Sequence, residues 1–239
     1  MADQSHAFLA LAERLANVRD RIDAAARRVN RAADQITLIA ISKTHPTETL
    51  RAGLNSGLTD FGENRVQEAE GKIIELGRKA ARWHLVGHLQ SNKARRAVKL
   101  FDVIHSLDSA DLAQRLESMC LAERIEELLG LIQIDLGGEQ TKTGIAPREL
   151  TGLLDALSDC QRLRLVGLMT LPPYFENPEC ARPYFKTLRE LRDELQLQGR
   201  FGERTGELSM GMSHDFEIAI EEGATMVRIG RAIFGTRDK

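Results

Sequence analysis

Short apolar runs alternate with amphipathic segments along this chain from residue 36 almost to its end. Each run ends in a turn and is too short for a free-standing helix, which is typical of buried parallel strands. The predicted strands are 36–42, 58–61, 83–86, 102–105, 129–135, 163–168, 206–209 and 225–229. Helices are predicted between them near 47–56, 64–80, 91–98, 109–126, 147–159, 179–198 and 214–222, with a short last helix from 231.

Eight strand-and-helix units predict an α/β protein with a single (β/α)8 TIM-type barrel, in which residues 1–239 form one domain. A length of 239 residues suits such a barrel. A doubly wound sheet of eight strands is the alternative, although no GxGxxG follows the first strand. Residues 5–31 repeat apolar side chains at steps of three and four, which predicts an extra amphipathic N-terminal helix.

Composition and charge exclude several classes of protein. Apolar residues make up 42% of the chain, which is enough for a full core. A net charge of −2 gives no polybasic signature, so we expect no nucleic-acid partner and no attachment to membranes. The N-terminus lacks the features of a signal peptide, and the three cysteines show no metal-like spacing. We therefore expect a soluble cytoplasmic protein with reduced cysteines and no metal site.

Polar or small residues recur where the predicted strands end. Carboxyl ends of parallel strands meet at one mouth of a barrel, where ligands bind. Lys43 follows the first strand, and desolvation there would favour the neutral amine that a Schiff-base lysine needs. A surface lysine whose stem lies on apolar residues is the alternative. The other residues near strand ends are Gly62, Glu63, Asn64, His84, His105, Ser106, Asp135, Lys142, Met169, Thr170, Ser209, Met210, Gly211, Ser213, Arg228 and Gly230.

The last two units predict an anion site. Ser213 stands before the predicted helix 214–222 as its N-cap, and Gly230 precedes the last helix in the same way. Loops after strands seven and eight commonly hold a phosphate in this fold, since free N–H groups of a first helical turn attract anions. Ser213 could equally be a helix cap and nothing more.

Arg228 and His84 have two interpretations each, and the role of Lys142 is left open by the pattern. Arg228, at the end of the last strand, either pairs with an acidic residue of the rim or contacts a ligand. His84 lies on an apolar strand and is either a core histidine or a ligand contact. Lys142 lies in a loop, and the pattern alone gives it no geometry.

Seven segments resemble the pyridoxal phosphate homeostasis proteins (the YggS/PROSC-like family), which are similar to the barrel domain of alanine racemase. The segments follow the family's order from the first strand to the C-terminus. They are AISKTHP around Lys43, FGENRVQE at 61–68, WHLVGHLQSNK at 83–93, IHSLDS at 104–109, QTKTGI at 140–145, GLMTLPP at 167–173 and LSMGMSHDFEIAIEEGATMVRIGRAIFG at 208–235.

The resemblance implies that Lys43 holds pyridoxal 5′-phosphate (PLP) as a Schiff base, with Lys142 near the cofactor. It implies that Ser213 and the Gly230-Arg231 backbone bind the phosphate. Arg231 departs from the threonine or serine found in many members, so its contact with the phosphate is open. The ring would be lined by Asn64, His84 and Met210, and Arg228 would approach the pyridine nitrogen.

Three functions are compatible with these residues. An arginine at the pyridine nitrogen disfavours its protonation and weakens the ring as an electron sink. We also expect no second domain to supply the tyrosine base of alanine racemase, so a PLP carrier or regulator without robust catalysis is the leading hypothesis. PLP-dependent apoenzymes are its expected partners, and the protein would be a monomer or weak dimer. A racemase-type PLP enzyme is the alternative; a PLP-free phosphate-binding barrel enzyme is a third.

Overall fold

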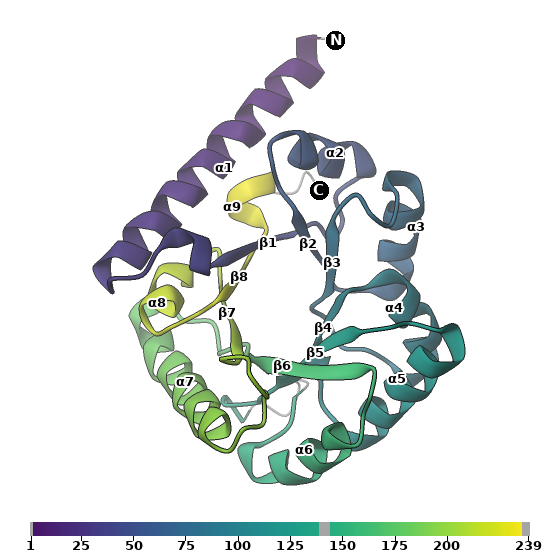
Figure 1. The fold of residues 1–239 in the computed structure, drawn as a ribbon. Helices are drawn as coiled ribbons and strands as arrows, with labels where there is room; N and C mark the ends of the chain where they lie inside the picture. Colours follow the sequence, from purple (N-terminus) through teal and green to yellow (C-terminus); the bar gives the residue numbers. More distant parts are fainter. Residues whose placement is uncertain (1, 139–143, 236–239) are drawn as a thin grey trace.

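Eight parallel strands close into a barrel with helices around the outside (Figure 1). The computed structural model describes residues 2–138 and 144–235. β1 pairs with β2 on one side and with β8 on the other, so the sheet has no free edge. The predicted (β/α)8 barrel is therefore confirmed. The strands are β1 Thr37–Ile41, β2 Asp60–Glu63, β3 Arg82–Leu85, β4 Val103–Leu107, β5 Leu128–Gln133, β6 Leu163–Met169, β7 Glu207–Met212 and β8 Met226–Ile229.

A helix follows each strand and covers the outside of the barrel (Figure 1). Short 3₁₀ turns precede three of them, at Ser91–Lys93, Pro147–Glu149 and Pro178–Ala181, and another, Ala33–Gln35, precedes β1. The helices are α1 Ala2–Arg28, α2 Thr47–Asn55, α3 Val66–Leu76, α4 Ala94–Leu100, α5 Ala110–Glu123, α6 Leu150–Ser158, α7 Arg182–Leu197, α8 Phe216–Glu221 and α9 Arg231–Phe234.

The N-terminal helix α1 confirms the prediction of an extra element. Its apolar side chains, which include Leu15 and Val18, are buried, and it packs against α8 and α9. Two ion pairs join its polar side to α8, from Arg21 to Glu217 at 2.6 Å and from Arg28 to Glu221 at 2.6 Å. In Figure 1 the helix lies beside α8 and α9 on the outside of the barrel, with its first turns extending past the ring.

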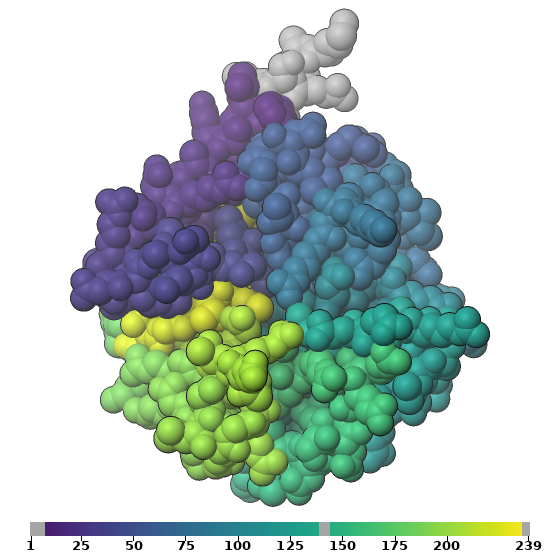
Figure 2. All heavy atoms as spheres, viewed as in Figure 1, coloured from purple at the N-terminus to yellow at the C-terminus, as the bar shows by residue number. Residues whose placement is uncertain are grey.

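The apolar core has two parts. A large cluster lies between the strands and the surrounding helices, where Trp83 and Phe61 are fully buried. A smaller cluster consists of strand side chains that point into the barrel, as expected when side chains alternate along each strand. Its members are Ile39, Val103, Leu131, Val166, Met169 and Met226. In Figure 2 atoms fill the centre of the ring on the face shown, as expected for a packed barrel interior.

Two strand boundaries differ from the prediction in ways that matter for function. β2 extends to Glu63, whereas the prediction ended it at residue 61. β7 extends to Met212, whereas the prediction ended it at residue 209. Glycines inside both extensions, Gly62 and Gly211, look like turn residues in the sequence. In the barrel the missing side chain leaves space for neighbouring side chains. A Cβ on Gly62, for example, would lie 2.5 Å from the Ile41 side chain.

Among the described residues, no helix has both the length and the apolar character needed to cross a bilayer. The same part of the chain contains no group of three or more histidine, cysteine or acidic residues arranged to hold a metal ion.

Candidate functional site

A cavity of about 780 Å³ opens at the carboxyl ends of the strands. Its size lies within the range of small-molecule pockets, and its position is that of ligand sites in this fold. The residues that line it are Ile41, Lys43, His45, Asn64, Val86, Leu171, Met212, Ser213, His214, Arg228, Gly230, Arg231 and Gly235. The structure thus brings together Lys43, Asn64, Ser213, Arg228, Gly230 and Arg231, all of which the sequence predicted as site residues.

The cavity wall is cationic. Lys43, Arg228 and Arg231 contribute positive side chains, and His45 and His214 contribute imidazoles. Within the described residues, no carboxylate forms part of this wall. Positive charges that no acidic neighbour in the wall offsets attract an anionic ligand.

Ser213 and the start of α9 meet on one side of the cavity. The Ser213 hydroxyl accepts a hydrogen bond from the Ala232 backbone N–H at 3.4 Å. Gly230 fits closely against β1, since a Cβ there would approach the Ile41 carbonyl oxygen to 3.2 Å. A hydroxyl, backbone N–H groups and the exposed Arg231 therefore lie together, which is a suitable arrangement for phosphate oxygens.

The predicted role of Ser213 as a helix N-cap is wrong. α8 begins at Phe216, and Asp215 occupies its N-cap position. Residues 213–215 form a turn, in which Asp215 Oδ1 accepts a hydrogen bond from the Met212 N–H at 2.7 Å. Because β7 continues past the predicted end, the Ser213 hydroxyl lies near α9 and lines the cavity.

Arg228 is buried, although it also lines the cavity. Its guanidinium donates to Ser209 Oγ at 2.6 Å and to the Thr170 carbonyl at 2.9 Å. Burial lowers the pKa of Arg228 to about 10, which leaves it protonated at neutral pH. The charge of Asp215 nearby partly offsets this lowering of the Arg228 pKa. Within the described residues the two side chains form no direct ion pair, so the interpretation of Arg228 as a rim salt bridge is not supported.

A chain of polar side chains, all buried except the partly exposed Asp60, extends from Arg228 across the barrel interior. Ser209 Oγ lies 2.9 Å from His105 Nδ1, and His105 Nε2 lies 2.9 Å from His84 Nδ1. His84 Nε2 lies 2.9 Å from Asp60 Oδ1 at the start of β2. We call these five residues, Arg228, Ser209, His105, His84 and Asp60, the interior network. It connects β4 to β7, which are not neighbours in the sheet.

The charges of the interior network determine the direction of every hydrogen bond in it. Burial holds the pKa of His105 well below its ordinary value, and it also lowers the pKa of His84, so both rings are neutral. Although burial alone would raise the pKa of Asp60, hydrogen bonds from His84 and Thr59 leave it below the usual range. Arg228 can only donate and the Asp60 carboxylate can only accept. All four hydrogen bonds therefore have the same direction. Arg228 donates to Ser209, Ser209 to His105, His105 to His84, and His84 to Asp60.

Two predicted ring contacts lie outside the cavity wall. His84 is fully buried in the interior network, so it is a core histidine with satisfied hydrogen bonds. Met210 is fully buried in the large core cluster. Side chains alternate along β7, so Ser209 faces inward and Met210 faces the helices. The next methionine, Met212, lines the cavity in its place. Lys142, another predicted contact, lies outside the described residues.

The prediction missed His45 and His214 as lining residues. His45 packs against Phe234 with ring centroids 4.9 Å apart. His214 stacks on Tyr174 at 5.4 Å, and its Nε2 lies 3.1 Å from the carbonyls of Phe175 and Glu176. Both histidines follow a strand within a few residues, so the signal that identified Lys43 and Ser213 would also have identified them.

Gly87 supports the position of Asn64. A Cβ at Gly87 would lie 2.3 Å from the Asn64 backbone oxygen, so Gly87→Ala must displace that segment. We expect the substitution to lower the free energy of unfolding by about 1–3 kcal/mol, measured by urea denaturation.

Gly152→Ala is the matched control, because Gly152 lies within α6 with nothing near its Cβ position. There alanine should stabilise by up to about 1 kcal/mol. Equal effects at the two glycines would contradict the proposed crowding.

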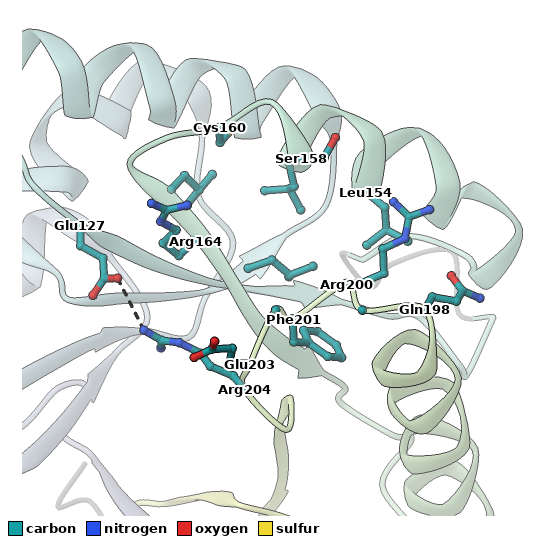
Figure 3. A pocket seen from close by; sticks show the side chains of 15 residues that line it. Glu127, Leu154, Ser158, Cys160, Arg164, Gln198, Arg200, Phe201, Glu203 and Arg204 are labelled. Carbon is teal, nitrogen blue, oxygen red and sulfur yellow. Dashed lines mark ion pairs between the residues drawn. The ribbon is translucent and has the colours of Figure 1, made fainter.

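A larger hollow of about 1180 Å³ lies at the opposite end of the barrel, where β6 begins (Figure 3). Its rim carries charges of both signs, and Arg204 pairs with Glu127 at 3.6 Å. Arg164, Arg200 and Glu203 also border it in Figure 3. None of the described residues that line this hollow is a lysine, and the hollow lies away from the carboxyl ends of the strands. We therefore place the functional site in the cavity around Lys43.

Comparison with known proteins gives consistent matches over nearly the whole chain. The family model of the alanine racemase N-terminal domain matches residues 14–238. A protein of Aquifex aeolicus called pyridoxal phosphate homeostasis protein is 45% identical over 225 residues, which cover 94% of this chain and 97% of that protein. The structure of PipY from Synechococcus elongatus with PLP bound has a TM-score of 0.81 and 39% identity, with 94% of this chain and 100% of that chain covered.

A more distant likeness concerns the fold alone. Alanine racemase from Corynebacterium glutamicum is 17% identical to this chain, with a TM-score of 0.69. The match covers 96% of this chain and 61% of the racemase chain. The barrel is thus common to both proteins.

Proposed function

Because this chain belongs to the pyridoxal phosphate homeostasis protein family, we propose that it binds PLP in the cavity around Lys43. We further propose that it buffers or delivers this cofactor to PLP-dependent apoenzymes. One observation carries the proposal: a lysine at the end of β1 lines a cavity whose wall is cationic and, within the described residues, free of carboxylates. An amine and an anion site in one cavity suit an aldehyde that bears a phosphate.

The cavity residues have distinct roles in this proposal. When bound, PLP supplies an aldehyde that reacts reversibly with amines and a ring that can withdraw electrons. Lys43 would hold the cofactor through its aldehyde, for which the amine would have to lose its proton. Ser213 and the backbone at Gly230 and Arg231 bind the phosphate. Asn64, which lines the cavity, would contact the ring.

Arg228 argues against the strong electron sink of an aminotransferase-type enzyme. Its Nη1 and Nη2 groups donate within the barrel, and its charge opposes protonation of a pyridine nitrogen nearby. A ring that stays unprotonated is a weak electron sink. Neither Tyr174 nor Tyr184 lines the cavity, so the described residues place no tyrosine there as a base opposite Lys43. We therefore propose that PLP binding occurs without robust turnover.

The absorbance spectrum of the purified protein tests the proposal. We expect a visible band after incubation with PLP that borohydride removes, and we expect peptide mapping to locate the reduced adduct at Lys43. A colourless protein that cannot be loaded with PLP would contradict PLP binding.

The same loaded protein distinguishes a carrier from a racemase-type enzyme. Small amino acids are incubated with it in D2O, and exchange of the α-proton is followed by NMR. We expect exchange no faster than with free PLP. Faster exchange that disappears in Lys43→Ala would instead establish an enzyme.

A further inference from the structure

A buried cluster of charges lies behind Lys43, outside the cavity wall. Lys72 of α3 is 7% exposed, and its Nζ lies 2.6 Å from Glu63 Oε1 and 2.8 Å from Glu68 Oε1. Glu63 is fully buried at the end of β2. Burying these charged groups costs free energy unless close partners compensate. A buried ion pair often contributes little net stability to the folded protein. The cluster therefore calls for another explanation.

The cluster holds the backbone on both sides of Lys43. Lys72 Nζ donates to the Ser42 carbonyl at 2.7 Å, and the Thr44 N–H donates to the Glu68 carboxylate. The Ser42 hydroxyl also donates to Glu63 Oε1 at 2.7 Å. Residues 42 and 44 are thus fixed by two side chains of α3 that are themselves paired.

The backbone at this point needs such support. Thr44 has a φ of 68°, which is uncommon for a non-glycine residue and unfavourable for a β-branched one. A conformation of this kind persists only where surrounding contacts impose it, and it is often found at functional sites. The hydrogen bond from the Thr44 N–H to Glu68 is one such contact. The chain therefore turns sharply directly after Lys43, at a position that α3 controls.

We propose that Lys72 and Glu68 are positioning residues that orient the Lys43 side chain for covalent attachment to the PLP aldehyde. The proposal rests on the proposed function. Neither residue lines the cavity, so neither contacts the cofactor. They act by fixing the Ser42 carbonyl and the Thr44 N–H, and hence the direction in which Cα of Lys43 presents its side chain. Misplacing a reactive group by about 1 Å can cost about 100-fold in reactivity.

The test compares PLP with 4′-deoxypyridoxine 5′-phosphate, which has the same ring and phosphate but no aldehyde. Lys72→Met and Glu68→Ala are expected to weaken PLP binding about 10- to 100-fold and to reduce borohydride-trapped adduct at Lys43. Affinity for the deoxy analogue should change less than about twofold, since its binding does not use the Lys43 amine. Glu68→Gln should recover part of the loss, because its amide oxygen can still accept from the Thr44 N–H.

Two controls separate positioning from a general loss of structure. Lys99→Met removes a surface ion pair with Glu123 at 2.7 Å and should change neither affinity. In a Lys43→Ala background, Lys72→Met should have no further effect on PLP affinity, because the group through which it acts is absent. If Lys72→Met does not fold, the more exposed Glu68 carries the test.

Three results would overturn the inference. The first is an equal loss of affinity for PLP and the deoxy analogue, which indicates general damage to the cavity. The second is unchanged PLP binding in both Lys72→Met and Glu68→Ala. The third is an additive effect of Lys72→Met in the Lys43→Ala background. Failure of the proposed function is distinguishable, because the unaltered protein would then form no adduct with PLP.

Discussion

Replacing Lys43 by alanine is expected to abolish the borohydride-stable attachment of PLP while leaving the barrel folded. Within the described residues, Lys43 supplies the lysine amine of the cavity wall, so its loss removes the nucleophile. Lys43 is half-buried at a strand end, and we expect the free energy of unfolding to change by no more than about 1 kcal/mol. Ser213, Gly230 and Arg231 remain, so weaker non-covalent binding should persist. Absorbance and mass spectrometry after borohydride reduction measure the adduct.

Lys186→Ala is the matched control for this substitution. Lys186 lies on α7 with its side chain 57% exposed, and its loss changes the charge by the same amount. The control should retain the full adduct. An adduct that persists in Lys43→Ala would refute the assignment of Lys43, and mapping would then show which other amine reacts, with Lys142 the first to consider.

The sequence predicted the fold well because its main signal is local. Each short apolar run is bounded by turn residues and followed by an amphipathic segment, so element type and order can be read without knowledge of contacts. The errors occur at strand ends. β2 and β7 both continue through residues such as Gly62 and Gly211 that look like turn residues, and a strand in which glycine makes room for a neighbour has no distinctive local pattern.

Part of the cavity followed from the same rule. Residues at the carboxyl ends of strands converge, so Lys43, Asn64, Arg228 and Gly230 could be expected at one mouth. Met210 shows the limit of the rule. The pairing of β7 with β8 shifts register between Ser209 and Met212, so regular alternation does not continue along this strand. Met212 rather than Met210 lines the cavity.

The buried polar contacts could not be predicted. His105 and Ser209 are 104 positions apart in the chain and meet only because β4 and β7 face each other across the closed barrel. Nothing near either residue indicates the other. Lys72 likewise occurs in a helix that looks ordinary in sequence, and only the packing of α3 against β2 places its ammonium beside the Ser42 carbonyl.

Ser209→Ala is expected to lower the free energy of unfolding by about 2–4 kcal/mol. The Ser209 hydroxyl accepts from Arg228 Nη1 and donates to His105 Nδ1, so its removal leaves two buried groups without that partner. Each unsatisfied buried group costs about 1–3 kcal/mol, and more when it is charged. His105 is held neutral and Arg228 protonated, so neither can change its protonation state at low cost to compensate. Urea denaturation at neutral pH measures the loss.

Ser106→Ala separates the cost of disrupting the interior network from the cost of losing any buried serine hydroxyl. Ser106 is also fully buried, but among the described residues its hydroxyl makes a single hydrogen bond, to the Gly87 carbonyl at 2.8 Å. Its removal should cost about 1 kcal/mol, as expected for a single neutral hydrogen bond. A cost for Ser209→Ala no larger than this would mean that the hydrogen bonds of the interior network do not act together. A clearly larger cost would show that Ser209 links Arg228, at the cavity, to the Asp60 carboxylate at the other end of the barrel.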